Sequence, residues 1–327
     1  MQMLSPIARH RAREARRRSV LLTAGVVALA VVCVGIGITG QAALSQPNAQ
    51  AFDESGSVSG DTPIGADLTS GVLPRPQGVA ALPVPEFAVA NPAGPAGVCD
   101  RPGVADALAS GADEAAIVAA GGGSAVRAAI VAGTASCFSL DDPARSWVVV
   151  DKLRAIQPLE WEPNDLVSIS GGQLMRQTSA DAFAAMVSDA SAAGMSDIIA
   201  NSGYRSYSYQ VGNHDRQLAA EGESAERTSA RAGFSEHQLG TTVDVQLPGG
   251  SIESFGGTQT SVWVSENAWR YGFIVRYEEG AYDIVGYEAE PWHLRYIGPQ
   301  LAAAYHDGGF HTLEEFFGLP AAPDYAS

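Results

Sequence analysis

Cysteine is scarce in this chain, with three residues among 327. Cys33 lies in an apolar run near the N-terminus, after Ala30-Val31-Val32, which is a poor lipidation signal. That leaves Cys99 and Cys137, and two thiols alone make a weak case for a metal site. In an exported protein these two are expected to form a disulfide, closing a loop of about 39 residues that stabilises the fold by roughly 4 kcal/mol.

Basic side chains are scarce beyond the N-terminus. Six of the 20 lysines and arginines precede residue 19, where only Glu14 opposes them, so the remainder of the chain carries 14 basic against 35 acidic side chains. A body with this excess of negative charge repels the phosphates of DNA and RNA. The composition therefore argues against nucleic acid as a partner.

The N-terminal arginines are followed by an uncharged, mostly apolar run of 21 residues, Ser19–Thr39. This length suffices for a helix that crosses a bilayer, and the positive-inside bias places everything after it outside. We expect a basic cytoplasmic N-terminus at residues 1–18 and an uncleaved membrane anchor at residues 19–40. A cleaved signal peptide, with small residues at Gly40-Gln41-Ala42, is the alternative. Both interpretations export the rest of the chain.

Composition and periodicity divide the exported part into four segments. Residues 41–97 are rich in Pro, Gly, Ala and Ser, which predicts a flexible, partly extended linker. Residues 98–140 predict a small helical region joined by the Cys99–Cys137 disulfide. Residues 141–320 mix helices and strands without regular βαβ alternation, which predicts an α+β domain with a small mixed or antiparallel sheet and flanking helices. Residues 321–327 form a tail.

Within residues 141–320 the apolar spacing predicts individual elements. Strands are expected at Trp147–Val150, Ile198–Ala200, Val243–Val245, Phe273–Tyr277 and around Trp292–Tyr296, and helices at Ser179–Ala193, Tyr209–Ala220 and Val264–Gly272.

Histidine is also scarce, with six residues, and two of them lie in contexts typical of metal ligands. His237 is followed by Gly240, which can turn the backbone sharply, and then by Asp244 on a predicted strand. A turn followed by a strand can present His237 and Asp244 to one point. His293 lies on the polar face of an alternating strand, with Glu290 three residues before it.

Two imidazoles and one carboxylate leave a fourth coordination position open, as in catalytic zinc sites, and a neighbouring glutamate supplies the base that such a site requires. Taken singly, each of these side chains is more often packed in a core, capping a turn or exposed to solvent. Their order and local contexts together favour the metal site.

Three blocks of the chain resemble the signature blocks of VanY-type D-alanyl-D-alanine carboxypeptidases, zinc D,D-peptidases whose wider family includes the D,D-dipeptidases. The blocks are Ser202-Gly203-Tyr204-Arg205-Ser206, Ser235-Glu236-His237-Gln238 with Gly240 and Asp244, and Glu290-Pro291-Trp292-His293. Tyr271–Tyr277 and Leu313-Glu314-Glu315 also resemble this family, so that the resemblance extends from near Trp147 to near Phe317.

The resemblance implies a role for each matching residue. It assigns one zinc ion to His237, Asp244 and His293, the catalytic base to Glu290, stabilisation of the oxyanion to Arg205, and substrate contacts to Gln210 and Ser235. The chain departs from the family at Thr242, where a small alanine-like residue is usual, and at Ala232, which is commonly proline.

The expected reaction is hydrolysis of the terminal D-Ala-D-Ala bond of peptidoglycan stem peptides, with release of D-alanine outside the membrane. An L,D-carboxypeptidase, a D,D-dipeptidase or a stem-peptide endopeptidase would use the same metal site. A non-catalytic cell-wall-binding module is the alternative of a different class, against which Glu290 and Arg205 argue, because binding alone requires neither. The sequence leaves open the oligomeric state and the use of another divalent metal.

Overall fold

The computed structural model describes residues 97–326. The expected cytoplasmic N-terminus, membrane anchor and linker up to residue 96 lie outside the described residues. Among those that are described, no single helix has the length and apolar composition needed to cross a membrane. The helices Asp113–Ala119 and Gly123–Val131 reach this length and apolar composition only when taken together, and they are bent by 83° relative to each other.

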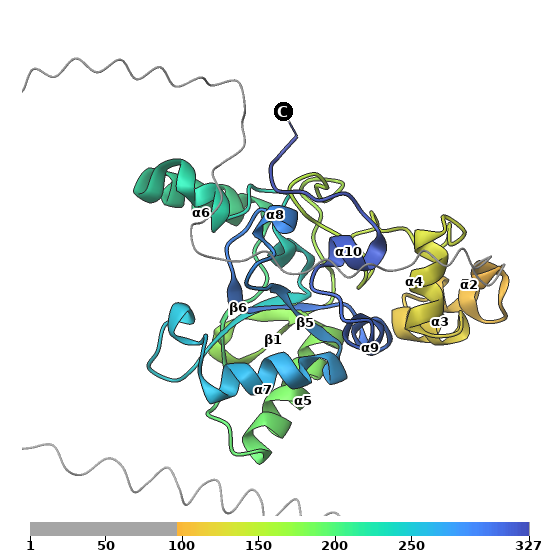
Figure 1. Cartoon of the computed structure of the whole chain (residues 1–327), viewed down its shortest axis with the longest axis horizontal. Helices are drawn as coiled ribbons and strands as arrows, with labels where there is room; N and C mark the ends of the chain where they lie inside the picture. Colours follow the sequence, from red (N-terminus) through yellow and green to blue (C-terminus); the bar gives the residue numbers. More distant parts are fainter. Residues whose placement is uncertain (1–96, 327) are drawn as a thin grey trace, which may run out of the picture. The chain divides into compact units, whose positions relative to one another are not determined.

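A four-stranded antiparallel sheet lies at the centre of the described fold (Figure 1). Its strand order is β3 (Ile199–Ser202), β4 (Thr242–Gln246), β6 (Glu290–Tyr296) and β5 (Phe273–Tyr277). A second, two-stranded antiparallel sheet joins β1 (Leu166–Ser168) to β2 (Leu174–Arg176). The structure therefore confirms an α+β domain with a small antiparallel sheet and flanking helices.

Two helices pack on one face of the central sheet, below the strands in Figure 1. These are α5 (Gln177–Ala192) and α7 (Gln259–Asn267), and α7 continues into a 3₁₀ turn, η6 (Ala268–Tyr271). Alternate strand residues such as Val243 and Val245 are buried against them, as period-2 patterning requires. The α7 helix begins earlier than its apolar spacing suggests because Thr258 caps it, its Oγ1 accepting a hydrogen bond from the Ser261 N–H at 3.0 Å.

The remaining elements of the domain are helices and 3₁₀ turns. The α-helices are α6 (Tyr207–Glu221), α8 (Tyr282–Val285), α9 (Pro299–Asp307) and α10 (Leu313–Phe317), and the 3₁₀ turns are η2 (Ser170–Gly172), η3 (Gly222–Arg227), η4 (Glu236–Leu239) and η5 (Ile252–Ser254).

The helical region before residue 140 contains η1 (Val98–Asp100), α2 (Val104–Ala109), α3 (Asp113–Ala119) and α4 (Gly123–Val131), and the expected Cys99–Cys137 disulfide is confirmed. This region shares a hydrophobic core with α9 and α10. A side chain at Gly123 would place its Cβ 2.0 Å from the Gln300 carbonyl oxygen, so only glycine permits α4 to approach α9 so closely.

The predicted strand at Trp147–Val150 is wrong. The segment is buried and its side chains alternate between two hydrophobic clusters, which explains the strand-like pattern. No strand pairs with it in the described part of the chain; instead, Arg295 Nη2 donates to the carbonyl oxygens of Ser146 at 3.0 Å and Val148 at 2.9 Å. A side chain thus satisfies backbone groups that a neighbouring strand usually satisfies.

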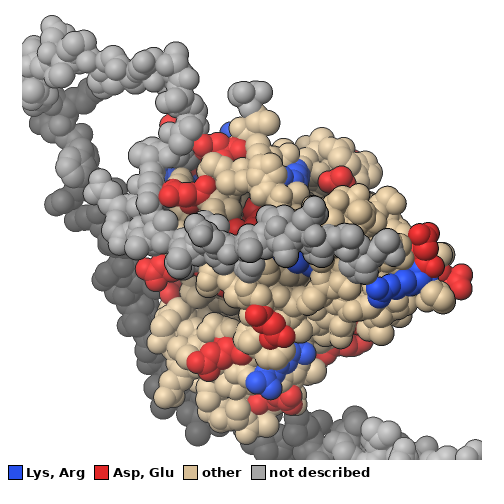
Figure 2. Space-filling model, turned by 45° about the vertical axis from the view of Figure 1, so that its right-hand side comes forward, with Lys and Arg blue, Asp and Glu red and all other residues tan. Residues whose placement is uncertain are grey.

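Acidic side chains are dispersed over the face shown in Figure 2, with fewer lysines and arginines between them. This distribution agrees with the net charge of −16. A face of this kind lacks the basic stripe by which proteins follow a nucleic-acid backbone.

A buried ionic network joins strand β5 to helix α10 and turn η4. The Arg276 guanidinium donates to both carboxylate oxygens of Glu314, at 3.0 and 2.7 Å, and to Glu236 Oε1 at 3.0 Å. All three side chains are almost completely buried. Buried charges of this kind are tolerated only because each has a partner.

We predict that Arg276→Met destabilises the fold by about 3–5 kcal/mol, because it leaves carboxylates buried without their main partner. Arg231→Met is the control, since it removes the Arg231–Glu226 pair, whose arginine side chain is 51% exposed, and costs less than about 1 kcal/mol. Denaturant unfolding followed by circular dichroism measures both. Equal losses in the two variants would show that the network does not stabilise the fold.

Candidate metal centre

The pairing of β4 with β6 brings two of the expected ligands together. Asp244 lies directly opposite His293 in this antiparallel pair. Side chains at opposed positions lie on the same face of a sheet, with Cβ atoms about 5 Å apart. The neighbouring pair, Val243 and Leu294, faces the hydrophobic core instead. One face of these strands therefore supplies the core and the other supplies the site.

His237 reaches the same point from the turn η4, which ends at Gly240 in a left-handed conformation with φ of 69°. A Cβ at Gly240 would lie 3.0–3.2 Å from Arg176, Leu166 and Pro163, so the turn favours glycine for both conformation and space. His237 Nδ1 lies 2.7 Å from the Gly203 carbonyl oxygen, to which it donates a hydrogen bond. This contact leaves Nε2 unprotonated and directed at the site.

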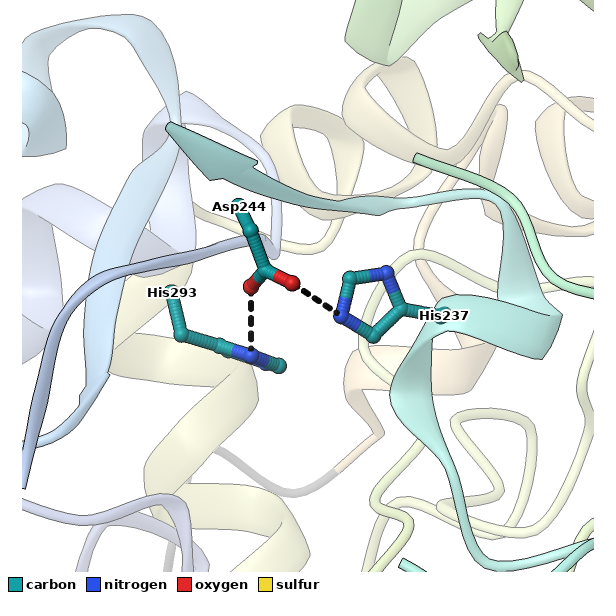
Figure 3. Close-up of side chains that lie close together, drawn as sticks. All are labelled: His237, Asp244 and His293. Atoms are coloured by element: carbon teal, nitrogen blue, oxygen red, sulfur yellow. Dashed lines mark ion pairs between the residues drawn. The ribbon is translucent and has the colours of Figure 1, made fainter. Parts of the chain in front are cut away.

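The Asp244 carboxylate lies between the two imidazole rings (Figure 3). Its Oδ2 is 3.2 Å from His237 Nε2 and its Oδ1 is 3.1 Å from His293 Nδ1. One ligand atom from each residue lies within 4.8 Å of the others, and all three residues are buried. Despite these short distances, His237 Nε2 and Asp244 Oδ1 have no aligned hydrogen bond to any described residue. A divalent cation would satisfy these buried atoms, so the donor set fits a metal.

The charge states of the three side chains suit a cation. Burial, reinforced by Arg205, lowers the pKa of His237 to about 4, so its imidazole is neutral. Burial also lowers the pKa of His293, but its close contacts with the carboxylates of Asp244, Glu236 and Glu290 outweigh burial and raise the pKa well above its usual value. The acidic groups that favour a proton on His293 would equally favour a metal ion in place of that proton.

Glu290 and Arg205 lie beside the three ligands. Glu290 Oε2 is 3.3 Å from His293 Nδ1, and burial raises the pKa of its carboxyl, opposed by the hydrogen bond with His293. Arg205 Nη2 is 3.4 Å from Asp244 Oδ2. Both residues line a cavity of about 670 Å³ together with His237, Asp244 and His293. The structure thus gathers all five of these expected site residues at one cavity.

The two residues expected to contact the substrate are placed differently. Ser235 lines the cavity. Gln210 is fully buried; its Oε1 accepts a hydrogen bond from Arg205 Nη1 at 3.1 Å and its Nε2 donates to the Ala230 carbonyl oxygen at 2.7 Å. In this arrangement the Gln210 amide orients the guanidinium. A direct substrate contact by Gln210 or Ser235 stays a prediction.

Three further histidines lie outside the metal group. His214 is buried with Nε2 3.6 Å from Glu226, His306 stacks on Trp269, and His311 Nδ1 lies 2.7 Å from Glu278. Arg231 pairs with Glu226, whose Oε1 lies 2.9 Å from Arg231 Nη2.

Sequence reasoning missed one residue of the site, Glu236. Its Oε2 lies 3.2 Å from His293 Nε2, and its Oε1 accepts from Arg276 and lies 3.5 Å from Arg295 Nη1. Burial raises its pKa, but the two arginines lower it further, to about 2, so the carboxylate is ionised. It therefore holds the His293 ring with Nδ1 facing Asp244. The only signal in the sequence was an acidic residue next to His237, which equally describes a solvated charge.

We predict that Glu236→Gln weakens metal affinity by about 10–100-fold, the usual effect of removing the outer partner of a ligating histidine. Glu226→Gln is a matched control, because Glu226 also contacts one histidine and one arginine but lies outside the metal group. Titration calorimetry with Zn²⁺ measures both, after thermal unfolding has shown that each variant is folded. An unchanged affinity in folded Glu236→Gln would remove this role from Glu236.

Comparisons with known proteins agree with this geometry. Residues 172–299 match the family model described as VanY, D-alanyl-D-alanine carboxypeptidase. The chain is 36% identical over 192 residues to the Bacillus subtilis protein YodJ, covering 55% of this chain and 69% of YodJ. It is 37% identical over 142 residues to an Enterococcus faecium D-alanyl-D-alanine carboxypeptidase, covering 43% of each chain, so it spans less than half of that relative.

Among solved structures, the LdcB LD-carboxypeptidase is similar at 38% identity and a TM-score of 0.50, covering 54% of this chain and 87% of that one. Residues 172–299, which match the family model, contain Arg205, Glu290 and the three expected metal ligands. The family match and these relatives confirm the resemblance of the three sequence blocks: the chain belongs to the VanY family of D-alanyl-D-alanine carboxypeptidases.

Proposed function

We propose that this chain is a zinc-dependent carboxypeptidase that hydrolyses the terminal D-Ala-D-Ala bond of peptidoglycan stem peptides and releases D-alanine. The observation that carries the proposal is the meeting of a His/Asp/His group with Glu290 and Arg205 in one cavity. The Enterococcus relative, which is named for this activity, supports the choice of substrate.

His237 Nε2, His293 Nδ1 and the Asp244 carboxylate would hold one zinc ion and leave a position for water. When bound in such a site, zinc lowers the pKa of water toward about 7 and polarises the peptide carbonyl. Glu290 is the base: its carboxylate accepts the proton of the attacking water and then returns it to the leaving amine of D-alanine. The raised pKa of Glu290 suits a group that must both accept and release a proton.

Arg205 supplies positive charge to the oxyanion that develops at the attacked carbonyl. Gln210 and Asp244 hold its guanidinium against the metal group. Loss of one such donor costs about 3–4 kcal/mol of transition-state stabilisation in comparable sites. A guanidinium with this role must be held in a fixed position, and the buried Gln210 amide holds it instead of lining the cavity.

An L,D-carboxypeptidase is the second candidate, favoured by the similarity to LdcB. Both reactions use the same ligands and base, so they differ only in how the cavity accommodates the residue before the cleaved bond. Tyr204, Tyr209 and Trp292 form part of the cavity wall and are candidates for this difference.

We also propose that the enzyme acts outside the membrane, tethered by the apolar run at residues 19–40. The Cys99–Cys137 disulfide supports an oxidising location. A tethered domain on a linker would reach substrates in the wall close to the membrane.

We predict that Glu290→Ala retains one zinc ion and loses about 10²–10⁴-fold in kcat, because it removes the base and none of the ligands. Glu288→Ala is the control, since Glu288 is exposed, lies two residues away and does not line the cavity. The zinc-loaded proteins are incubated with a muropeptide pentapeptide ending in D-Ala-D-Ala, and the products are weighed by mass spectrometry. A Glu290→Ala variant with the kcat of the unmodified chain would refute the assigned base.

The same assay decides the specificity. Loss of one alanine, abolished by a chelator and by Glu290→Ala, supports the D,D-carboxypeptidase. Release of a dipeptide, or cleavage of the tetrapeptide alone, would keep the mechanism and replace the proposed substrate. If zinc binds but no stem peptide is cleaved, the proposed activity is wrong and a binding module takes its place.

A further inference from the structure

A second, larger cavity of about 940 Å³ lies beside the cavity at the metal centre, and Tyr277 lines both. We call it the β5 groove; it runs along strand β5 between helices α7 and α9, which flank this strand in Figure 1. Apolar side chains contribute much of its lining, among them Val262, Trp269, Ile274, Tyr305 and Phe310. Val262 on α7 is 50% exposed and lines this groove.

The groove follows an open strand edge. β5 is the last strand of the central sheet and pairs with β6 on one side, while no described strand pairs with its other side. An open edge presents backbone N–H and C=O groups that can pair with an added strand. Peptides bind to other proteins in this way, with main-chain hydrogen bonds along the edge and pockets for alternate side chains. The β5 groove therefore has the form of a site for one extended, apolar segment.

The chain itself contains such a segment among the residues that lie outside the described part. Leu82-Pro83-Val84-Pro85-Glu86-Phe87-Ala88-Val89-Ala90 has one charge in nine residues. In an extended strand, successive residues direct their backbone groups to opposite edges. Pro83 and Pro85 have no N–H on one edge, whereas Leu82 and Val84 keep theirs on the other. This pattern suits an outermost strand, which pairs on one side only.

The point at which the described fold begins belongs to the same hydrophobic cluster as part of the groove. Val98 is fully buried in the same hydrophobic cluster as Ile274, Tyr305 and Phe310, which line the groove. Only residues 91–96 separate the segment from Gly97, and six extended residues span about 20 Å. A connection that spans the gap would give the segment a high effective concentration at the groove, so that weak contacts would suffice for binding.

We propose that residues 82–90 bind in the β5 groove and add a strand to the open edge of β5. The occupant is thus the chain's own linker, and the inference does not depend on which bond the enzyme cleaves. The groove is also lined by Ala289 and Pro291, the residues on either side of Glu290. A bound segment would pack against the far side of the strand that carries the proposed base.

Photocrosslinking of the full chain tests the proposal. A photoreactive benzoylphenylalanine replaces Val262 in the groove, and in the control it replaces Val211, an exposed apolar residue on α6 outside the groove. Crosslinked peptides are mapped by mass spectrometry. We expect crosslinks from position 262 to residues 82–90, with a yield independent of protein concentration, and none from position 211. Crosslinks between two chains, or none to residues 82–90, would overturn the proposal.

A pair of linker variants tests whether the crosslink depends on residues 82–90. Phe87→Asp places a charge in the proposed strand and is expected to reduce the crosslink to the level of the Val211 control, because a charge is costly to bury in an apolar groove. Val72→Asp makes a similar change upstream and should leave the yield unaltered. Equal yields from the two variants would overturn the assignment to residues 82–90.

Discussion

The carboxylate of Glu236 links the metal centre to the stability of the fold. One oxygen contacts His293 Nε2, and the other lies against Arg276 and Arg295. Arg276 in turn binds Glu314 of α10, while Arg295 satisfies the carbonyl oxygens of the buried segment after Ser146. A buried anion is stable only with partners of this kind. The orientation of a metal ligand therefore depends on α10 and on an irregular segment far away in the chain.

Successive side chains of a β-strand point to opposite faces, so that one face of this sheet packs in the core and the other forms the site. On β4, Val243 and Val245 point into the core and Asp244 points into the site. On β6, Leu294 is opposite Val243, and His293 is opposite Asp244. Because rigid strands carry two ligands, the distance between them is set by backbone hydrogen bonds, whereas a flexible loop would leave it variable. His237 is held independently, through its ring contact with the Gly203 carbonyl oxygen.

Membership of the VanY family and the geometry of the site lead to the same chemistry from separate observations. The family match identifies a peptidase domain, and the cavity brings Glu290 and Arg205 beside the group formed by His237, Asp244 and His293. The helical region at residues 98–140 adds no group to this cavity in the described structure. It packs on α9 and α10 and brings the end of the linker to the domain, which is the connection that the proposed strand in the β5 groove requires.

The sequence by itself determined the fold class and most of the site. Period-2 spacing marked the strands at Val243–Val245 and Phe273–Tyr277, and local sequence marked His237, Asp244, His293, Glu290 and Arg205. These are properties of a few adjacent residues, and metal-ligand chemistry restricts which side chains can serve. Expectations that rested on a few neighbouring residues agree with the structure.

Only the tertiary structure decided the contacts made between distant parts of the chain. Nothing near Glu236 shows that Arg276, 40 residues later, turns it into a buried partner of His293. Nothing near Trp147 shows that Arg295 replaces a neighbouring strand, and nothing near Gln210 shows that its amide is used by Arg205 instead of lining the cavity. The partner of a polar side chain depends on which residues the fold brings together. The neighbouring sequence is the same whether that partner is water or a buried charge.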